Sequence, residues 1–363
     1  MNNGYYVTSL RSGEELGVDE KIALHIRVFG NYYNMKHVQI PENVFKRKYI
    51  SKLPFGRSGR DYQAAYKQMD NPAFVYIRKL PFDKDFITFV KIIREKNPKC
   101  KILVELPTYP YEKDEYDRWY NYFVLQKDRH YRLQLKKYID AIVTYAKDKN
   151  IFGCKTLNVA NGVDCKAINP VSDYSLNPDE IHLIAVARLR KHHGFERLIK
   201  GMADYYKTDQ KIKVYFDIVG DGPEFEYYKG LINEHKMNKY VTMYGPVKPT
   251  ELDKYYNRGD IAISSLGFYK LNLNYSTNLK NRDYMVRGLP IVCCCDDDAF
   301  KNNRYVMIVP NDDSNIVVDK IVEFYMNTYK KGKESVINEV RNVAFENVDI
   351  HSTYKDVLDF IQS

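Results

Sequence analysis

No stretch of the sequence approaches the roughly 18 consecutive apolar residues that a membrane-spanning helix needs. The first residues, Met1–Tyr6, have no basic segment followed by an apolar core, so we expect no signal peptide. The six cysteines include no Cys-x-x-Cys pair, and three are adjacent at Cys293–Cys295, where alternating side chains make a poor disulfide framework. We interpret these three as a buried strand end rather than as a metal site with Asp296–Asp298. These absences predict a cytoplasmic protein without membrane spans or disulfides.

The sequence also lacks internal repeats, low-complexity tracts and any recognisable nucleic-acid-binding module, so its net charge of +9 does not point to nucleic acid. The charge is uneven. Residues 1–172 hold 30 Lys and Arg against 19 Asp and Glu, whereas residues 173–363 hold 26 against 28. The richest basic stretch runs from Lys46 to Arg60. Two interpretations stay open for it, an ordinary solvated face and a surface for an anionic partner.

The chain of 363 residues is long for one domain and comfortable for two. Short apolar runs alternate with amphipathic stretches, which is typical of βα units and parallel sheets. We therefore predict an α/β fold. In the first half we expect strands at 73–77, 101–106, 141–143 and 156–159, with helices at 82–96 and 116–138. In the second half we expect strands at 181–187, 213–219, 241–244, 261–264 and 290–295, with helices at 195–206, 224–235, 250–257 and 279–287.

Three loops in the second half follow predicted strands, at the edge where open α/β sheets bind ligands. The loop Val186–Gly194 carries Arg188 and further cationic side chains that can clamp a diphosphate. The loop Gly220–Pro223 is a tight turn whose glycines let the backbone approach a ligand. In the third loop, Ser276, Thr277 or Asn278 can cap a helix whose free N–H groups bind phosphate oxygens. Together the loops predict a nucleotide-diphosphate site.

Asp283 lies one to two turns inside the predicted helix that begins near Asn278. Its carboxylate can accept hydrogen bonds from ribose hydroxyls, or it can pair with Arg287 four residues later. We favour the ribose role and keep the ion pair as the alternative.

These elements resemble a GT-B glycosyltransferase of the retaining family-four branch, the glycosyl transferases group 1. The resemblance covers roughly residues 180–300 and rests on Arg188-Leu189 before His193-Gly194, on Ile218–Pro223, and on Asp283 before Gly288-Leu289-Pro290. It implies two Rossmann-like domains that face each other across a cleft. Residues 1–172 would bind the acceptor and residues 173–345 the nucleotide sugar, while residues 346–363 would form a helix that packs back on the first domain.

The resemblance also implies roles for single residues. Arg188 matches the arginine that contacts the donor diphosphate, and His193 stands where the family has a lysine, so its charge would depend on pH. Asp283 matches the glutamate that holds the ribose, and Tyr275 stands where the family has a glutamate near the donor sugar. The donor-binding set that we assign is Arg188, His193, Gly220, Asp221, Lys248, Tyr275, Ser276, Thr277, Asn278, Leu279, Lys280 and Asp283. No metal or other cofactor is expected.

The first half resembles the acceptor domain of such enzymes more loosely. Gly17, before a predicted helix at 19–29, resembles a glycine loop that faces the cleft. Glu105 ends a strand and is a candidate to orient or deprotonate an acceptor hydroxyl, with helix capping or pairing with Arg78 as the alternative. Arg78 is a candidate for acceptor or phosphate contact. Tyr109 and Tyr111 either stack on a sugar ring or pack the turn.

We therefore predict a retaining hexosyl-type glycosyltransferase, with Glu105, Arg188 and His193 as catalytic candidates. Tyr284–Pro290 resembles a subgroup of bacterial surface-polysaccharide transferases. The expected partners are a UDP- or GDP-linked sugar, a glycan or lipid-diphosphate acceptor, and the anionic inner face of the cell membrane. The alternative is a catalytically inactive GT-B subunit that supports another glycosyltransferase.

Overall fold

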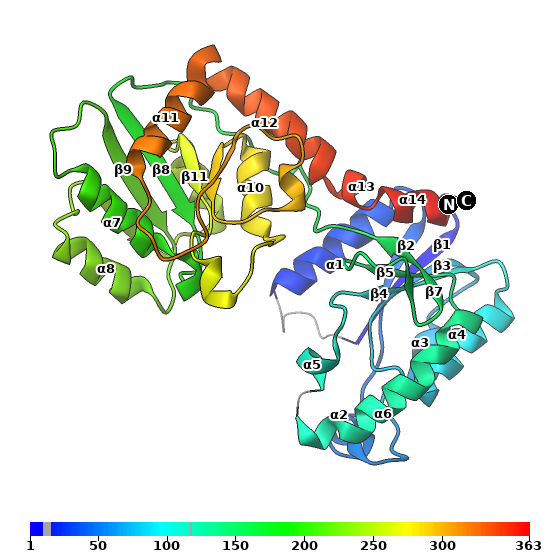
Figure 1. The fold of residues 1–363 in the computed structure, drawn as a ribbon. Coiled ribbons are helices and arrows are strands. Elements are labelled where there is room, and N and C mark those ends of the chain that lie inside the picture. The colour runs from blue at the N-terminus through cyan, green and yellow to red at the C-terminus, as the bar shows by residue number, and fades with distance from the viewer. Residues whose placement is uncertain (10–15, 117) are drawn as a thin grey trace. The chain divides into compact units, whose positions relative to one another are not determined.

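A computed structural model describes residues 1–9, 16–116 and 118–363 of the chain, which forms two compact units (Figure 1). Unit 1 comprises Met1–Ala160 and Thr353–Ser363, and unit 2 comprises Asn161–Ser352. The sequence placed the boundary at residue 172. It lies earlier because the segment after Asn161 joins the end of unit 2: the Val163 N–H donates to the Val348 carbonyl at 2.9 Å, and the Ile350 N–H donates to the Val163 carbonyl at 2.9 Å.

Unit 1 is built on a seven-stranded sheet with the order β2-β1-β3-β4-β5-β7-β6, parallel except for the β6–β7 pair. Its strands are β1 (Asn3–Thr8), β2 (Asn34–Gln39), β3 (Pro72–Arg78), β4 (Lys101–Leu106), β5 (Ala141–Thr144), β6 (Asn150–Ile151) and β7 (Cys154–Asn158). Its helices include α1 (Leu16–Phe29), α2 (Val44–Lys48), α3 (Tyr62–Lys67), α4 (Lys84–Lys96), α5 (Glu112–Glu115) and α6 (Tyr122–Tyr131). The central strands are buried along almost their whole length, as expected for a parallel sheet covered on both faces.

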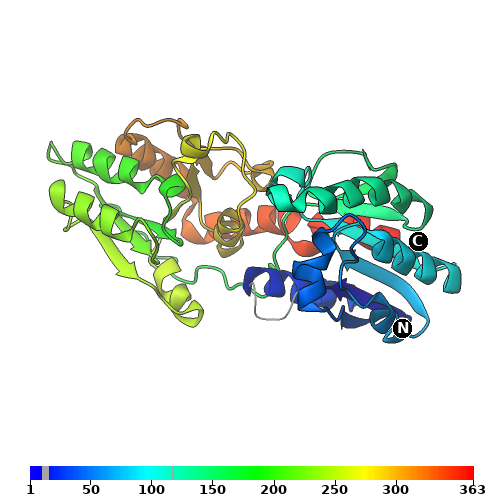
Figure 2. The ribbon, with the colours of Figure 1, turned by 90° about the horizontal axis from the view of Figure 1, so that it is seen from below.

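The C-terminal helix α14 (Lys355–Gln362) belongs to unit 1 and lies beside its blue N-terminal elements in both ribbon views (Figures 1 and 2). Its buried face carries Val357, Leu358 and Ile361. Just before it, the Tyr354 ring lies 4.6 Å from the His25 ring of α1, centre to centre, and its hydroxyl is 2.6 Å from that of Tyr145. Apolar burial and these polar contacts attach the end of the chain to unit 1.

Unit 2 contains a fully parallel six-stranded sheet with the order β10-β9-β8-β11-β12-β13. The strands are β8 (Glu180–Val186), β9 (Lys213–Val219), β10 (Val241–Gly245), β11 (Ile261–Ile263), β12 (Ile291–Cys293) and β13 (Val306–Ile308). The main helices are α7 (Phe195–Tyr205), α8 (Phe225–Glu234), α9 (Leu252–Tyr256), α10 (Leu279–Arg287), α11 (Val318–Thr328), α12 (Lys333–Asn347) and the short α13 (Ile350–Thr353). Helices α7 and α8 cover one face of the sheet, and α10 and α12 cover the other (Figure 1).

The strand order of unit 2 reverses at β8. The chain runs outward from β8 to β9 and β10, then returns to the other side of β8 at β11. Such a switch point opens a crevice at the carboxyl ends of the two strands, where open α/β sheets bind their ligands. We therefore expect a ligand site at the loops after β8 and β11.

The expected α/β class is confirmed for both units. The single helix expected at 116–138 is instead divided: a 3₁₀ turn at Trp119–Asn121 precedes α6, and a second at Arg132–Lys137 follows it. Among the described residues, no helix combines the length and the apolar character needed to cross a bilayer.

Candidate functional site

The loops after β8 and β11 are joined through their backbones at the switch point. The Leu266 N–H donates to the His193 carbonyl at 2.8 Å, and the Gly267 N–H donates to the His192 carbonyl at 3.2 Å. Gly194 has a φ of +63°, and a Cβ at this position would lie 2.6 Å from the Gly267 nitrogen. Only glycine allows this approach, which fixes the basic loop against the neighbouring strand end.

The turn after β9 supports the same basic loop from its other side. The Leu189 N–H donates to the Asp221 carbonyl at 2.8 Å, while the Gly222 N–H donates to the Asp221 carboxylate at 2.7 Å. A Cβ on Gly220, whose φ is +127°, would lie 2.0 Å from the Ala187 carbonyl oxygen. The sequence suggested that these glycines let the backbone approach a ligand. In the structure they approach the Ala187–Leu189 backbone, so the turn is a scaffold for Arg188.

Replacing Gly220 with alanine is expected to lower the free energy of unfolding of unit 2 by about 2–3 kcal/mol, because strain at positive φ adds to a backbone clash. Chemical denaturation followed by circular dichroism measures the change. Gly230→Ala is the matched control, because a Cβ there meets nothing within 4 Å inside α8. That control should stabilise by about 0.5–1 kcal/mol. Equal destabilisation by both substitutions would contradict the scaffold role.

Helix α10 begins at Leu279 and directs its free N–H groups out of its open end. Of the three cap candidates, Asn278 is the residue used: its side-chain oxygen accepts the Asn281 N–H at 2.9 Å. The N–H groups of Leu279 and Lys280 precede the capped position at this end of the helix. Buried Tyr284 ties α10 to the end of β8, because its hydroxyl accepts the Val186 N–H at 3.0 Å.

Lys280, in the first turn of α10, reaches the switch point. Its Nζ donates to the Ser265 hydroxyl after β11 at 3.3 Å and lies 5.7 Å from the centre of the Phe195 ring. Burial lowers the pKa of Lys280 to about 7, against a smaller opposing effect of Cys294. An ammonium in this environment is partly desolvated and gains from a phosphate oxygen.

His193 is buried beneath this group and is neutral at physiological pH. Burial, followed by the positive charges of Lys280, His192 and Arg190, lowers its pKa to about 2. Its Nδ1 accepts the Arg190 N–H at 3.1 Å, so the proton of the neutral ring lies on Nε2. The expectation that its charge would vary with pH is therefore wrong. His193 offers a neutral N–H donor in place of the ammonium of the family lysine.

Arg188 follows β8 on the scaffolded loop, and its side chain is exposed. It has no ion-pair or hydrogen-bond partner within the described ranges. Its guanidinium is thus available to an anion at the carboxyl end of β8. Lys248 is also exposed and lies further out, beyond β10 and before a 3₁₀ turn.

Asp283 pairs with Arg287, the alternative that the sequence left open, and it also accepts a hydrogen bond from Tyr256. Arg287 donates to one carboxylate oxygen at 3.1 Å, and the Tyr256 hydroxyl donates to the other at 2.5 Å. About 30% of the Asp283 side chain is exposed. Because a carboxylate has about four acceptor sites, the two contacts leave room for further donors such as ribose hydroxyls.

Tyr275 and the acidic segment Asp296–Asp298 lie next to each other. Tyr275 pairs with Asp296 in a short parallel bridge, and burial together with Asp298 raises the pKa of the Tyr275 phenol well above its ordinary value. We did not assign Asp296–Asp298 to the phosphate site from the sequence, yet the segment lies beside it, because the turn after β12 returns to the start of α10. There buried Asp297 accepts from Arg282 at 3.0 Å and from Asn281 at 2.9 Å.

Arg282, Asp297 and Ser265 were not singled out from the sequence, yet they shape this site. Arg282 is fully buried, and besides Asp297 it donates to the Asn278 carbonyl at 3.0 Å, which anchors the cap of α10. The available signal was local. Arg282 lies within a helix that we expected to pack on the sheet, and Ser264-Ser265 come at the end of a buried apolar strand. Polar residues at such positions are rarely buried without a partner, which marks them as candidates. Cys293–Cys295 are buried free thiols, as expected for a strand end.

In unit 1, Glu105 is fully buried at the end of β4. Its carboxylate accepts from Arg78 at 3.2 Å, from Tyr6 at 3.3 Å and from Tyr145 at 3.3 Å. Burial alone would raise the pKa of Glu105, but Arg78, His25 and Lys21 outweigh it, so that the pKa lies below its ordinary value. These contacts favour the ion-pair alternative for both Glu105 and Arg78 over a role toward an acceptor.

The two tyrosines after β4 pack the turn. Tyr111 is buried and donates to Asp128 at 2.6 Å, while the Tyr109 ring lies 5.8 Å from that of Phe152. Gly17 lies in the first turn of α1, and residues 10–15 before it lie outside the described part of the chain.

Comparisons with known proteins agree with this geometry. The family model for glycosyl transferases group 1 matches residues 171–268, which include the switch point. The alpha-monoglucosyldiacylglycerol synthase of Acholeplasma laidlawii is 31% identical over 114 residues, or 31% of this chain and 27% of that protein. The match thus spans about a quarter of the relative's length.

Solved glycosyltransferase structures match the whole chain at low sequence identity. The sucrose-phosphate synthase of Thermosynechococcus elongatus shares 12% identity with a TM-score of 0.58, over 100% of this chain and 98% of its own. A lipopolysaccharide outer core galactosyltransferase shares 15% with a TM-score of 0.55, over 100% and 99%. HepE of Anabaena, solved with UDP, shares 12% with a TM-score of 0.55, over 100% of both chains.

Proposed function

We propose that this protein, which has the GT-B fold and is of the glycosyl transferases group 1 type, transfers a sugar from a nucleotide-diphosphate donor bound by unit 2. One observation carries the proposal. Arg188 in the loop after β8, Lys280 in contact with Ser265 after β11, and the open end of α10 all belong to the switch-point loops, and the loops after β8 and β11 are fixed to each other through their backbones. Such an arrangement suits a diphosphate.

In the proposed reaction, cleavage of the bond between the sugar and the diphosphate leaves negative charge on the β-phosphate. The Arg188 guanidinium, the Lys280 ammonium and the N–H groups of Leu279 and Lys280 would stabilise that charge, a preorganised electrostatic effect that is usually large. His193 would add a neutral N–H donor. We assign no metal, as the resemblance implies, and propose retention of anomeric configuration on the same ground.

The nucleoside would lie along α10, where Asp283 has acceptor capacity left for the ribose hydroxyls. The donor sugar would lie near Tyr275. In place of the family glutamate, this chain offers a phenol held by Asp298. Tyr275 and Asp298 can still exchange hydrogen bonds with sugar hydroxyls. The negative charge, however, lies on Asp298 behind the phenol and not at the position of the family glutamate.

Two relatives support the proposal. The name of the Acholeplasma relative states a glucosyl lipid product, and the Anabaena structure holds UDP. By extension, we propose that this chain uses a sugar nucleotide as donor, most simply a UDP- or GDP-linked sugar. Its acceptor would be a glycan or a lipid-linked molecule of bacterial surface-polysaccharide synthesis. The excess positive charge of residues 1–172 supports action at the anionic inner face of the cell membrane.

UDP, GDP, ADP and dTDP compared side by side are expected to raise the melting temperature unequally, with one diphosphate clearly best. A ligand at about 100 times its Kd stabilises by about 2.7 kcal/mol. Differential scanning fluorimetry measures the shift. Asp283→Asn should weaken the best nucleotide but not inorganic pyrophosphate, which has no ribose. If the variant keeps the full nucleotide shift, Asp283 does not hold the ribose.

Tyr275 in place of a carboxylate favours a second candidate, a GT-B subunit that binds nucleotide without turnover and supports another glycosyltransferase. Incubation with a panel of sugar nucleotides separates the two. Release of nucleoside diphosphate with or without acceptor supports the enzyme, whereas nucleotide binding without any release supports the inactive partner.

A further inference from the structure

Unit 1 exposes a group of large apolar side chains on α2, α6 and the segments beside them. Figure 1 shows α2 and α6 next to each other at one end of the unit. The members with the greatest exposure are Phe55, Trp119, Phe45, Tyr122, Tyr49 and Leu53. Phe55 is 99% exposed and Trp119 is 87% exposed. Helix α2 buries none of its residues. Folded proteins seldom expose contiguous apolar groups of this size without a binding role.

These side chains stand on a rigid support. The ammonium of Lys127 in α6 donates to three backbone carbonyls of the neighbouring segment: Ser51 at 2.6 Å, Leu53 at 3.1 Å and Gly56 at 2.8 Å. The loop that carries Leu53 and Phe55 is thereby fastened to α6. On this support Phe55 and Trp119 stay almost fully exposed.

The exposed groups are neighbours in space. Phe55 and Phe123 line one cavity of about 530 Å³. The Lys52 ammonium lies 3.9 Å from the centre of the Tyr120 ring, next to Trp119, and the Phe45 and Tyr49 rings are 5.2 Å apart. The segments after β2 and after β4 therefore meet here, at the carboxyl edge of the unit 1 sheet, where this fold class receives its ligands.

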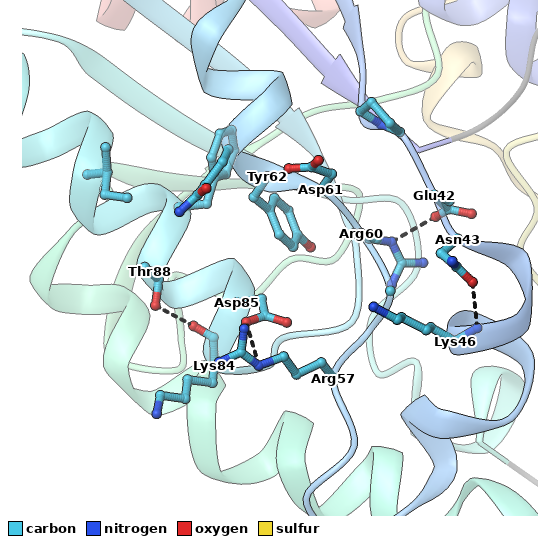
Figure 3. A pocket seen from close by; sticks show the side chains of 15 residues that line it. Glu42, Asn43, Lys46, Arg57, Arg60, Asp61, Tyr62, Lys84, Asp85 and Thr88 are labelled. Atoms are coloured by element: carbon cyan, nitrogen blue, oxygen red, sulfur yellow. Dashed lines mark hydrogen bonds and ion pairs between the residues drawn. The ribbon is translucent and has the colours of Figure 1, made fainter.

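Cations are interleaved with the apolar groups. Residues 43–60 contain six Lys and Arg and no Asp or Glu. A cavity of about 760 Å³ adjoins the Phe55 loop and is lined by Lys46, Arg57 and Lys84 (Figure 3). Its acidic residues are already engaged in part: Glu42 pairs with Arg60 at 2.9 Å, and Asp85 lies 4.0 Å from Arg57. Lys46 and Lys84 have no carboxylate partner among the residues that the structure describes.

We propose that this aromatic–basic surface, formed by Phe45–Arg57 and Trp119–Phe123, docks on an anionic lipid bilayer, with Phe55 and Trp119 entering its interfacial layer. Basic residues attract the lipid phosphates, while aromatic and aliphatic side chains partition into the acyl boundary. The inference rests on the proposed function in one respect: a surface at the acceptor edge would bring unit 1 to a lipid-linked acceptor. Exposed rings beside unpaired cations fit a lipid surface better than a protein partner, whose interface core is depleted in lysine.

The chain supplies its own probe, because Trp119 is its only tryptophan. With the full chain, vesicles of phosphatidylglycerol and phosphatidylcholine should shift the tryptophan emission to shorter wavelength, and brominated acyl chains should quench it. The protein should bind vesicles of phosphatidylcholine alone at least about tenfold more weakly. At about 0.5 M salt, where charges are screened beyond roughly 4 Å, a residual fraction should remain bound. Vesicle binding without any change in tryptophan emission would overturn the proposal, as would no binding at low salt.

Variants separate the two components of binding. Phe55→Ser is expected to weaken sedimentation with anionic vesicles by roughly tenfold or more, the loss expected from one large apolar side chain, and to remove the salt-resistant fraction. Lys46→Glu should weaken binding at low salt and spare that fraction. Met326→Ser is the matched control, since Met326 is 51% exposed on α11 of unit 2. Equal losses in Phe55→Ser and Met326→Ser would overturn the assignment of the surface.

Failure of this proposal and failure of the proposed function give different results. Phe55→Ser should keep the full nucleotide shift in melting temperature, because its change lies in unit 1. If no sugar nucleotide is turned over but the emission shift persists, the enzyme proposal fails and the membrane surface stands. If a water-soluble acceptor is glycosylated while vesicles leave the tryptophan emission unchanged, the surface fails and the enzyme stands.

Discussion

Arg188→Ala is expected to lower kcat/KM for sugar transfer by about 10²–10³-fold, the usual effect of removing one donor that stabilises developing charge. The loss should fall mainly on kcat, because the charge on the β-phosphate grows as the sugar bond breaks. The scaffold supports this expectation: the Asp221 carbonyl accepts the Leu189 N–H, and the glycine turn closes against Ala187, so the loop keeps its place when the guanidinium is removed.

Two further variants sharpen the Arg188 result. Arg188→Lys keeps a point charge and loses the planar fork, so it should recover only part of the activity if both phosphate oxygens are held. Arg304→Ala makes the same chemical change at an exposed arginine paired with Glu339, and it should leave kcat/KM within twofold. Initial rates of nucleoside diphosphate release measure all three. A loss below tenfold in Arg188→Ala would remove this residue from the reaction.

The second unit follows its sequence pattern closely because each element carries a local signal. The strand expected at 213–219 and the helix expected at 279–287 lie at those residues in the structure. Both are bounded by glycines that adopt positive φ, Gly220 and Gly288, which no other residue accommodates as readily. Local backbone chemistry alone therefore places these ends.

Unit 1 was less predictable because its signals are not local. Strand β1 occupies Asn3–Thr8 inside the sheet, between β2 and β3, although Asn3-Gly4-Tyr5-Tyr6 contains no aliphatic run. Its tyrosines can be buried because partners distant in sequence meet their hydroxyls: the Tyr6 hydroxyl donates to Glu105 and contacts His25, and the Tyr5 hydroxyl donates to the Asp70 carbonyl. Such a match between a polar tip and remote partners becomes visible only once the chain has folded.

The candidate site divides in the same way. The types of residue at the strand ends indicated phosphate chemistry, but their charge states depend on burial. His193 and Lys280 illustrate this: neighbouring groups in one crevice, one has a pKa lowered to about 2 and the other to about 7. No spacing in the sequence distinguishes a neutral donor from a titrating cation.

Affinity for the best nucleoside diphosphate is expected to fall as the pH rises from 7 to 9, by up to about tenfold per pH unit. The pKa of Lys280 in the free protein is about 7, so the ammonium is present below that pH and lost above it. The phosphate cannot produce the fall, since its second ionisation lies near about 6 and would strengthen binding. His193 cannot either, because it is neutral across this range.

Three variants show which group causes the fall in affinity with pH. Isothermal titration calorimetry at each pH measures the affinity. Lys280→Arg keeps its charge throughout and should bind with an affinity that does not change from pH 7 to 9. Lys280→Met should bind the nucleoside diphosphate weakly, with an affinity that also does not change with pH. Cys294 is a buried thiol near Lys280 whose hydrogen bond with Cys295 lowers its pKa, so Cys294→Ser must keep the wild-type slope if Lys280 is responsible. A flat wild-type profile would show that Lys280 does not contact the diphosphate.

The same lysine should destabilise the protein without ligand, which separates a binding role from a structural one. Its pKa is about 7 in the folded state and about 10.5 when unfolded, so unfolding takes up a proton between these values and stability rises with pH across that window. Below pH 7 the ammonium is charged in both states, and the full penalty of its desolvation is present. Lys280→Met should therefore raise the melting temperature most at pH 6 and least above pH 10, while it weakens nucleotide binding at neutral pH. If Lys280 served only to stabilise the fold, Lys280→Met would instead lower the melting temperature at every pH.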